Sequence, residues 1–315
     1  MPGACDMETG VVGLGRMGAN MARRMMAGGH RVVVSNRSPG PIAQLASEGA
    51  VPAQSREELK NSLAAPRAVW VVLPAGDVTE QAIDELSGLL DSGDLVIDGG
   101  NSYYRDSIRR AEKLRARGIG YVDSGTSGGV WGLENGYSLM VGGDEPSIAR
   151  IRPLLETLAP GPDRGWGHVG PVGSGHFVKM VHNGIEYGMM QAYAEGFSLM
   201  RAKQEFGLDL HQVAEIWREG SVVRSWLLDL TANALQPDPT LAGIEPRVVD
   251  SGEGRWTAIE AIEQGVAAPV ILSALNVRFT SQDEVGFADR LLAALRGQFG
   301  GHAVPTFPDK TGSAT

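Results

Sequence analysis

The sequence contains one cysteine, Cys5, so the chain cannot form a disulfide bond within itself. Small secreted domains that depend on disulfide bonds are therefore excluded, and a reducing compartment is compatible with this composition. No apolar run approaches the roughly 20 residues that a membrane-spanning helix requires. The first residues also lack the basic segment and apolar stretch of a secretory signal. Together these absences predict a globular protein of the cytoplasm with no membrane partner.

Positive charge is scarce as well. Lys and Arg number 28 and Asp and Glu number 37, which gives 28 − 37 = −9 at pH 7. A nucleic-acid partner is not expected, because such proteins need a basic surface. A metal site is not expected either, because the six histidines form no H-x-x-x-H pair and no cysteine cluster exists. The G-x-S-x-G turn of serine hydrolases is also absent. The remaining expectation is a small-molecule ligand.

Glycine, by contrast, is abundant: 43 of 315 residues, about twice the usual share. In the first half of the chain, short β-prone runs alternate with helical patterns. Strands are expected at residues 9–13, 31–36, 68–73, 94–98, 119–123 and 138–142, and helices between them at residues 17–28, 42–48 and 106–117. This alternation predicts a parallel sheet with helices on both faces, an α/β Rossmann-type doubly wound sheet.

The amino-acid composition changes near residues 159–175. This segment is rich in Gly and Pro, which predicts a connection between domains. The chain after it is predicted to be helical, with helices at residues 177–206, 210–219, 226–234, 256–264, 270–279 and 287–299. We therefore expect a dinucleotide-binding domain at residues 1–172. An all-α C-terminal domain for substrate binding and oligomerisation is expected at residues 173–315.

The first motif is a G-x-G-x-x-G run that ends the first expected strand and opens the first expected helix. Its residues are Gly13, Leu14, Gly15, Arg16, Met17 and Gly18. The glycines permit a tight turn, and the helix N-terminus offers backbone N–H groups to a pyrophosphate. A glycine-rich turn without a ligand is the alternative interpretation.

The end of the second expected strand indicates which ribose is bound. NAD sites usually carry an acidic residue there, whereas Arg suits a 2′-phosphate. This chain has Asn36, Arg37 and Ser38 and no acid, which favours NADP, with NAD as the open alternative. Arg37 as a solvated turn residue is the other interpretation.

Two further loops follow expected strands. One holds Leu73, Pro74 and Ala75, and the other holds Asn101. Both lie where strands of an open α/β sheet end, which is the edge at which ligands bind. Asn101 is therefore a candidate for facing the nicotinamide or the substrate, although a lone Asn is more often a turn residue.

The helical stretch at residues 176–197 carries a polar stripe. At 100° per residue, five polar side chains fall within an arc of about 140°. They are Lys179, His182, Asn183, Glu186 and Tyr187. Burial beside apolar neighbours would shift the ionisation of Lys179 and Glu186 towards values useful for catalysis. A solvated stripe on an amphipathic helix is the competing interpretation.

The chain resembles the decarboxylating 6-phosphogluconate dehydrogenases in their short bacterial form. The resemblance runs from Gly10 to about His302. The residues that carry the resemblance are the glycine motif at 13–18, DGGNS at 98–102, GTSGG at 125–129, HFVKMVHNGIEY at 176–187, GEGRWT at 252–257 and RGQFGGH at 296–302. The helical motif is the most specific of these, whereas many dehydrogenases share the glycine motif.

The resemblance implies a reaction and a role for each matched residue. Lys179 matches the base that takes the proton of the substrate 3-hydroxyl while hydride leaves C3 for the nicotinamide, and the resulting β-keto acid loses CO2 without a metal. Glu186 matches the acid that protonates C1 of the enediol, which gives ribulose 5-phosphate in the pentose phosphate pathway. Asn101, Ser127, Gly128, Gly129, His182 and Asn183 match substrate contacts, and Tyr187, Arg255 and Arg278 match the phosphate-binding set. Arg296 and His302 match a tail pair that reaches a neighbouring subunit in the family.

The chain departs from the long family form in two ways: the helical domain is not duplicated, and residue 255 is Arg where the long form has Lys. A homodimer or homotetramer is nevertheless expected. Met7 offers a second start besides Met1. Two alternatives stay open. A non-decarboxylating β-hydroxyacid dehydrogenase does not usually carry a His three residues after the Lys, and a non-catalytic dinucleotide-binding regulator would have lost Lys179 or Glu186.

Overall fold

The computed structural model describes residues 7–300, which form two compact units. The first unit comprises the described residues up to Met189 together with residues 252–271, and the second comprises residues 190–251 and 272–300. The predicted domains, residues 1–172 and 173–315, divide the chain before the long helix α8 (Ser174–Ala202). The compact units divide within α8 instead, because its first half and α11 (Glu253–Gln264) belong to the unit that contains the sheet.

The first unit is built on one mixed sheet. Its strands are β1 (Glu8–Val12), β2 (Arg31–Ser35), β3 (Val51–Ala53), β4 (Ala68–Val71), β5 (Leu95–Asp98), β6 (Gly120–Ser127), β7 (Ser138–Gly142) and β8 (Trp166–Gly170). Among the described residues the spatial order is β3-β2-β1-β4-β5-β6-β7-β8. The chain leaves β1 towards β2 and later returns to β4 on the other side of β1. The carboxyl ends of β1 and β4 therefore form the point at which ligands bind in doubly wound sheets.

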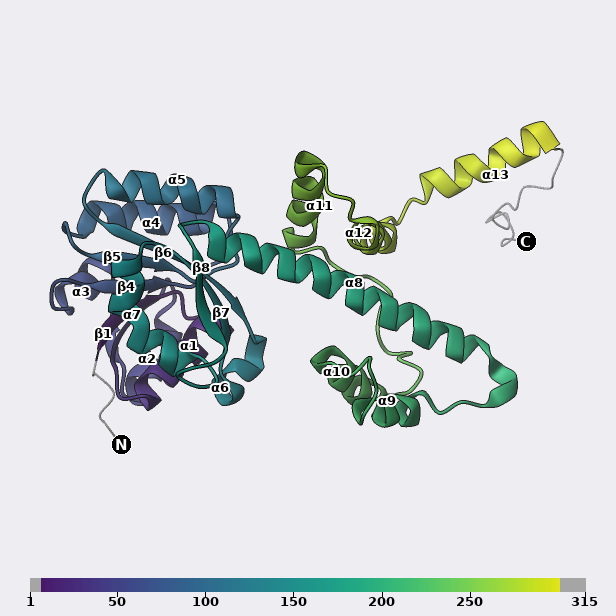
Figure 1. Cartoon of the computed structure of the whole chain (residues 1–315), viewed down its shortest axis with the longest axis horizontal. Coiled ribbons are helices and arrows are strands. Elements are labelled where there is room, and N and C mark those ends of the chain that lie inside the picture. The colour runs from purple at the N-terminus through teal and green to yellow at the C-terminus, as the bar shows by residue number, and fades with distance from the viewer. Residues whose placement is uncertain (1–6, 301–315) are drawn as a thin grey trace, which may run out of the picture. The chain divides into compact units, whose positions relative to one another are not determined.

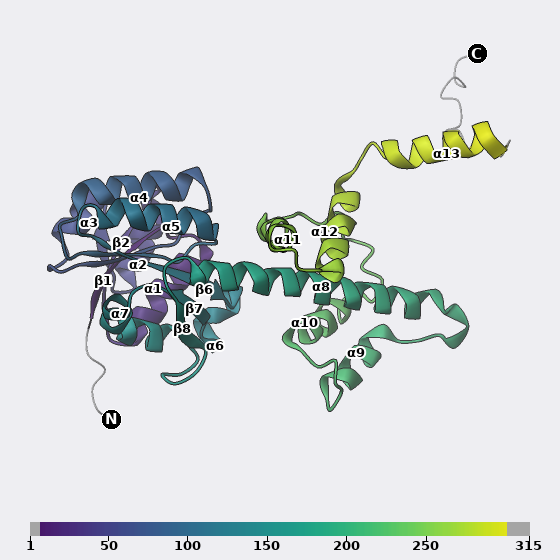
Figure 2. The same cartoon turned by 45° about the horizontal axis from the view of Figure 1, so that its top comes forward.

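Helices cover both faces of this sheet (Figures 1 and 2). One face carries α1 (Arg16–Ala27), α2 (Pro39–Ser47) and α7 (Glu145–Leu158), and the other carries α3 (Arg56–Asn61), α4 (Asp77–Leu89) and α5 (Tyr104–Arg115). Successive strand residues alternate between the two cores: Val11 lies in the core under α1, and Val12 lies in the core under α3 and α4. Because both faces are buried, the strands are continuous apolar runs rather than alternating ones. The Rossmann-type fold expected from the sequence is thus confirmed.

Three features of the sheet differ from the prediction. β7 pairs antiparallel with β6, so the sheet is mixed rather than wholly parallel. The strands β3 and β8 were not predicted, because β3 has three residues and β8 lies inside the segment interpreted as a connection. β8 pairs with β7 at the edge of the sheet, where one unpaired side tolerates Gly-rich sequence. A short turn with η1 (Gly129–Trp131) and α6 (Gly132–Asn135) joins β6 to β7.

The second unit is helical, as predicted. It contains the second half of α8, η2 (Gln204–Phe206), α9 (Leu210–Arg218), α10 (Trp226–Leu235), most of α12 (Pro269–Gln282) and α13 (Phe287–Gly300). Its small core joins Phe197 of α8 to residues of α9 and α10 such as Ala214 and Leu228. Within the described part of the chain, no helix is both long enough and apolar enough to cross a membrane.

Candidate active site

The glycine motif forms the turn between β1 and α1. Gly13 has φ +96°, and a Cβ there would lie 2.3 Å from the carbonyl oxygen of Val72. A Cβ on Gly18 would lie 2.0 Å from the carbonyl oxygen of Gly13, so the turn excludes side chains at both positions. Gly15, by contrast, has no atom within 4 Å of its Cβ position, which leaves the turn open to a ligand. The loops after β1 and β4 are therefore in contact at the carboxyl edge of the sheet.

The N-terminus of α1 meets the requirements of an anion site. No side chain caps it, and no acidic residue lies in its first turn. Its free backbone N–H groups and the helix dipole favour a negatively charged group. Leu14 is buried, Met17 is half-buried and Arg16 is exposed. This cradle fits the pyrophosphate of a dinucleotide.

The predicted ribose-binding residues Asn36, Arg37 and Ser38 lie just after the end of β2. Asn36 Oδ1 accepts a hydrogen bond from the N–H of Leu14 at 3.1 Å, and Asn36 Nδ2 donates to the carbonyl oxygen of Ser38 at 3.2 Å. Asn36 thus fastens the glycine turn to the end of β2. Arg37 and Ser38 are exposed beside it.

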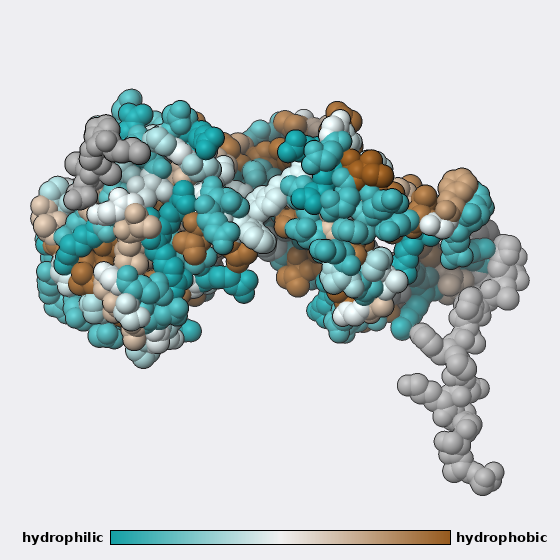
Figure 3. Space-filling view, turned by 90° about the horizontal axis from the view of Figure 1, so that it is seen from below, coloured by the Kyte–Doolittle hydropathy of each residue, from teal (hydrophilic) through white to brown (hydrophobic). Residues whose placement is uncertain are grey.

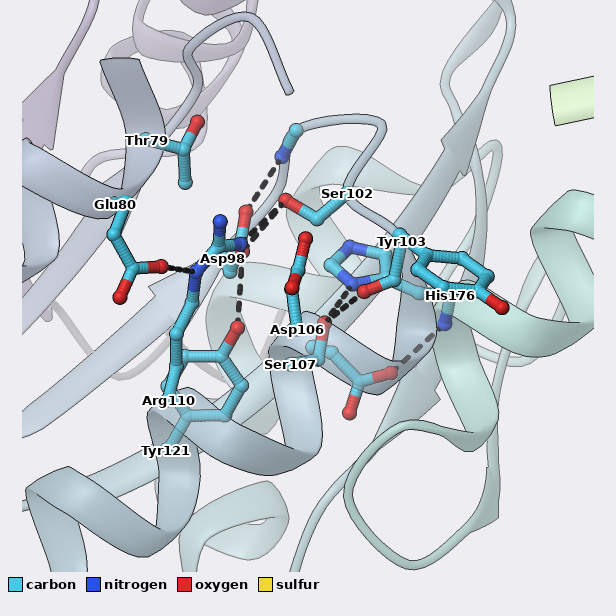
Figure 4. A network of polar contacts seen from close by, with 12 residues as sticks. Thr79, Glu80, Asp98, Ser102, Tyr103, Asp106, Ser107, Arg110, Tyr121 and His176 are labelled. Carbon is cyan, nitrogen blue, oxygen red and sulfur yellow. Dashed lines mark hydrogen bonds and ion pairs between the residues drawn. The ribbon is translucent and has the colours of Figure 1, made fainter. Parts of the chain in front are cut away.

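The loop after β5 rests on a buried polar network (Figure 4). Asp98 is fully buried, and its carboxylate accepts hydrogen bonds from the N–H of Gly100 at 3.2 Å and from Ser102 Oγ at 2.8 Å. Tyr121 OH donates to the same carboxylate at 2.9 Å, and Arg110 Nη1 donates at 3.1 Å. Burial raises the pKa of Tyr121 well above its ordinary value. The network leaves Asn101 exposed at the tip of a fixed loop.

A second set of contacts fixes the start of α8. Asp123 of β6 accepts hydrogen bonds from the N–H of Gly173 at 2.7 Å and from the N–H of His176 at 2.8 Å. The ring of His176 lies 2.7 Å from Ser107 Oγ through Nδ1. Gly125 approaches the helix so closely that a Cβ there would be 2.4 Å from the Cβ of Lys179. The sheet therefore determines where Lys179 lies.

Lys179 is the centre of a compact polar cluster. Its Nζ donates a short hydrogen bond to Asn183 Oδ1 and lies 3.5 Å from His182 Nδ1. His182 Nδ1 also lies 2.9 Å from Asn183 Oδ1, and Ser127 Oγ lies 3.4 Å from His182 Nε2. Desolvation lowers the pKa of Lys179, and the nearby negative charges of Glu253 and Glu186 oppose this shift. The cluster thus contains a buried amine with a reduced tendency to hold its proton.

The polar stripe of α8 is not a solvated face. Lys179, Asn183 and Tyr187 are buried, with exposed fractions of 6%, 8% and 6%. The side chains of His182 and Glu186 are half-buried, and His182 Nδ1 lies 3.9 Å from Glu186 Oε2. The competing interpretation of a solvated amphipathic stripe is therefore wrong for the three buried residues, since the sheet and α11 cover that side of the helix.

α11 packs against the same face of α8. Thr257 Oγ1 donates to the carbonyl oxygen of Met180 at 2.8 Å and to that of Glu253 at 2.9 Å. A Cβ on Gly254 would lie 2.4 Å from the ring of Tyr187, so glycine is required there. Glu253 is 2% exposed, and burial raises its pKa to about 7, a shift that Lys179 opposes and Glu186 reinforces. The sequence prediction named only Arg255 in this motif and missed Glu253 and Thr257.

The remaining predicted substrate residues lie in several places. Gly128 is half-buried and Gly129 exposed at the end of β6, and Arg255 is exposed in the first turn of α11. Arg278 belongs to the second unit, where its guanidinium donates to the carbonyl oxygen of Val249 at 3.0 Å. Arg296 is exposed on α13, and His302 lies outside the described residues. Leu73 is half-buried, and Pro74 and Ala75 are exposed in the loop after β4.

The described residues contain no group of three or more His, Cys, Asp or Glu side chains arranged to hold a metal ion.

Two family models and a curated relative match most of the chain. The family model for the NAD binding domain of 6-phosphogluconate dehydrogenase matches residues 8–170, and the model for the 6-phosphogluconate dehydrogenase C-terminal domain matches residues 175–294. The chain is 44% identical, over 95% of its length and 98% of the relative's, to the NAD(+)-dependent, decarboxylating 6-phosphogluconate dehydrogenase of Haloferax volcanii.

Solved structures of 6-phosphogluconate dehydrogenase and of a protein with the same fold also match the chain. The 6-phosphogluconate dehydrogenase of Plasmodium falciparum, studied with NADP+ and with 6-phosphogluconate, matches with a TM-score of 0.81 and 30% identity, over 97% of this chain and 67% of that one. The 3-hydroxyisobutyrate dehydrogenase of Mycobacterium tuberculosis matches with a TM-score of 0.71 and 24% identity, over 88% of this chain and 94% of that one. This second likeness concerns the fold alone.

Proposed function

Because this chain belongs to the 6-phosphogluconate dehydrogenase family, we propose that it converts 6-phospho-D-gluconate to ribulose 5-phosphate and CO2 while a nicotinamide coenzyme is reduced. The observation that carries the proposal is the buried cluster of Lys179, His182 and Asn183 beside Ser127. No metal ion takes part in the proposed reaction.

Lys179 is the proposed general base. Desolvation favours its neutral amine, and only a neutral amine accepts a proton from the substrate 3-hydroxyl. Asn183 accepts a hydrogen bond from Nζ and so holds the amine in place. After it has taken the proton, the ammonium group stabilises the negative charge that develops on the substrate oxygen during loss of CO2.

Glu186 is the proposed acid that protonates C1 of the enediol. It lies two helical turns after Lys179 on the same side of α8, so the base and the acid reach neighbouring carbons of one small substrate. Its side chain is half-buried, which leaves it access to solvent protons between turnovers.

The substrate is an anion with a carboxylate and a phosphate, and the chain has a net charge of −9. Local positive and polar groups must therefore hold it. We assign contacts with the sugar acid to Asn101, Ser127, Gly128, Gly129, His182 and Asn183, and contacts with the phosphate to Tyr187, Arg255 and Arg278. The roles of Arg296 and His302 in a neighbouring subunit's site remain predictions from the family resemblance.

The coenzyme is assigned to the turn at residues 13–18, to the loop at Leu73–Ala75 and to Asn101. When bound, the oxidised nicotinamide accepts the hydride that leaves C3. We propose NADP as the preferred coenzyme, because Arg37 and Ser38 lie exposed after β2 and no carboxylate is there to bind a ribose 2′-hydroxyl. The Haloferax relative is named NAD(+)-dependent, so NAD remains the competing coenzyme.

The function is tested with purified protein, 6-phosphogluconate and either NADP+ or NAD+ in the presence of EDTA, while nicotinamide absorbance and CO2 release are followed. We expect reduction of NADP+ with equimolar CO2. Lys179→Met should reduce the rate by about 10²–10⁴-fold, whereas Lys203→Met, an exposed lysine paired with Glu205, should leave it unchanged. Oxidation without CO2 would instead indicate a β-hydroxyacid dehydrogenase, and coenzyme binding without turnover would indicate a regulator.

The coenzyme assignment has its own test. Arg37→Ala should lower kcat/KM for NADP+ and leave that for NAD+ nearly unchanged, with Arg152→Ala, an exposed arginine of α7 that pairs with Glu156, as a control. Equal losses with both coenzymes would contradict a role for Arg37 in recognising the 2′-phosphate.

We also propose that the chain functions as a homodimer or a homotetramer. α13 exposes Phe287, Leu291, Leu292 and Leu295, and Figure 3 shows apolar residues in brown at the molecular surface. A cavity of about 440 Å³ in the second unit is lined by apolar side chains that include Tyr193, Phe197 and Leu241. Exposed apolar surface of this kind favours association between copies. Sedimentation of a fully active monomer would contradict this proposal.

A further inference from the structure

Glu253 is a buried acid for which the proposed reaction has no role. Its exposed fraction is 2%, and Oε2 has no hydrogen-bond partner. A buried carboxyl oxygen without a hydrogen-bond partner is costly, since the charged form of the group loses solvation there that nothing replaces. A buried polar atom without a partner therefore calls for an explanation, and functional sites are where such groups gather.

The packing of α11 places this acid next to the turn of α8 that carries Lys179. Thr257 Oγ1 bridges the two helices, because it donates both to the carbonyl oxygen of Met180, the residue after Lys179, and to that of Glu253. Gly254, the next residue, lies directly on the ring of Tyr187. A Cβ on Gly184 would be 2.7 Å from Cγ2 of Thr257, so α8 and α11 are in close contact at this turn.

The charged groups that act on Glu253 all come from α8. Lys179 favours its carboxylate, and Glu186 favours its neutral acid; Tyr187 packs against the next residue, Gly254. In return, Glu253 is the first of two acids that oppose the loss of the proton from Lys179. The charge of each buried group therefore changes the proton affinity of the other.

We propose that Glu253 is a positioning residue for this reaction: its buried carboxyl group sets the protonation state in which Lys179 meets the substrate. Ionised Glu253 holds Lys179 as the ammonium, and neutral Glu253 releases it to be the amine. The proposal rests on the proposed function for its consequence in catalysis, but the pairing itself is measurable without substrate.

The experiment compares the wild type, Glu253→Gln and Glu260→Gln. Glu260 is the matched control: it is also a buried acid of α11, but its carboxylate accepts a hydrogen bond from Tyr104 OH at 2.7 Å and does not act on Lys179. Acetylation of Lys179 by acetic anhydride is measured against pH by peptide mass spectrometry, and kcat/KM for 6-phosphogluconate is measured over the same range.

Loss of the carboxylate should move the titration of Lys179 to lower pH by about one unit, which makes Lys179 about tenfold more reactive on the acid side of its midpoint. The acid limb of kcat/KM should move in the same direction, and Glu260→Gln should move neither. A Glu253→Gln enzyme with an unchanged midpoint and a rate lowered equally at every pH would overturn the proposal, because that is the result of a purely structural role.

The outcomes separate the two proposals. If Lys179 labelling shifts but the wild type does not act on 6-phosphogluconate, the proposed function fails and the pairing stands. If the wild type is active and labelling does not shift, the pairing fails. Should Glu253→Gln not fold, infrared spectroscopy of the wild type decides: a carboxylic acid band that titrates near neutral pH supports the proposal, and its absence overturns it.

Discussion

The carboxylate of Asp123 accepts a hydrogen bond from the backbone N–H of His176 at 2.8 Å, 53 residues further along the chain. Asp123 is fully buried at the point where β6 pairs with both β5 and β7. The same carboxylate accepts the N–H of Gly173 at 2.7 Å, so it satisfies two donors at the start of α8. Lys179 follows one turn later, and its position therefore depends on a side chain of the sheet.

Asp123→Ala should destabilise the protein by about 2–4 kcal/mol, because it leaves two buried N–H groups without an acceptor. It should also lower kcat, since the first turn of α8 loses its anchor. Thermal unfolding and steady-state kinetics measure the two effects. The matched control is Asp144→Ala, which removes an exposed cap from α7 and should cost only about 1 kcal/mol without a loss of kcat.

Asp98→Asn should destabilise the protein by about 3–5 kcal/mol, because it leaves the buried guanidinium of Arg110 with one anionic partner fewer. It should also raise KM, since Asn101 lies between two residues that Asp98 holds. Chemical denaturation and KM for 6-phosphogluconate check this pair of effects. Unchanged stability would mean that the network around Asp98 contributes little.

Glu80 provides the acid-sensitive part of the same network. Hydrogen bonds from Arg109, and then from Arg110, lower the pKa of Glu80 from 4.5 to about 2. Because the folded-state pKa is depressed, its contribution to stability is complete above pH 4.5 and is lost as the pH falls towards 2. Glu80→Gln should therefore be less stable than the wild type at pH 6, with the difference shrinking on acidification. A difference that is constant from pH 6 to the acid-unfolding range would contradict this assignment.

Gly254→Ala should raise KM for the phosphorylated substrate by about tenfold and cost roughly 1–3 kcal/mol, because the new methyl group displaces the ring of Tyr187. Gly88→Ala is the control: its Cβ position meets no atom within 4 Å, and it lies exposed on α4, so it should stabilise by roughly 0.5–1 kcal/mol. Kinetics and thermal unfolding of both variants test the contact. An unchanged KM in Gly254→Ala would exclude Tyr187 from phosphate binding or show that its ring tolerates displacement.

Glu253→Gln should stabilise the protein at high pH. The pKa of Glu253 is raised to about 7 in the folded state, so the folded state binds more protons than the unfolded state between pH 4.5 and 7, and stability falls as the pH rises through that window. The Gln variant lacks this titration, so it should avoid a loss of about 3 kcal/mol in the free energy of unfolding. The expected result is a variant whose Tm gains on the wild type between pH 5 and pH 8. A constant Tm difference would mean that Glu253 is ionised in the folded protein throughout this range.

Much of the fold could be predicted from local sequence, since apolar β-branched runs and glycine turns act over a few residues. β7 was predicted with its observed bounds, Ser138–Gly142, and the turn from Gly13 to Gly18 lies where the motif placed it. The direction of β7 could not be predicted, because pairing direction depends on the path of the connection and not on the strand's own residues. The edge strand β8 was missed for a related reason: its pairing with β7, rather than its composition, makes it a strand.

In the candidate site, too, some features follow from local sequence and others depend on tertiary packing. The sequence by itself determined which chemical groups share one side of α8, because helical periodicity is local: Lys179, Asn183 and Glu186 follow from spacing alone. Only the tertiary structure decided that Lys179 is buried and that Glu186 is half-exposed, because burial depends on what the sheet and α11 place over the helix. It also brought α11, which carries Glu253, against the turn of α8 that carries Lys179. Local sequence could not predict that Glu253 lies near Lys179, since the two residues meet only when α11 packs against α8.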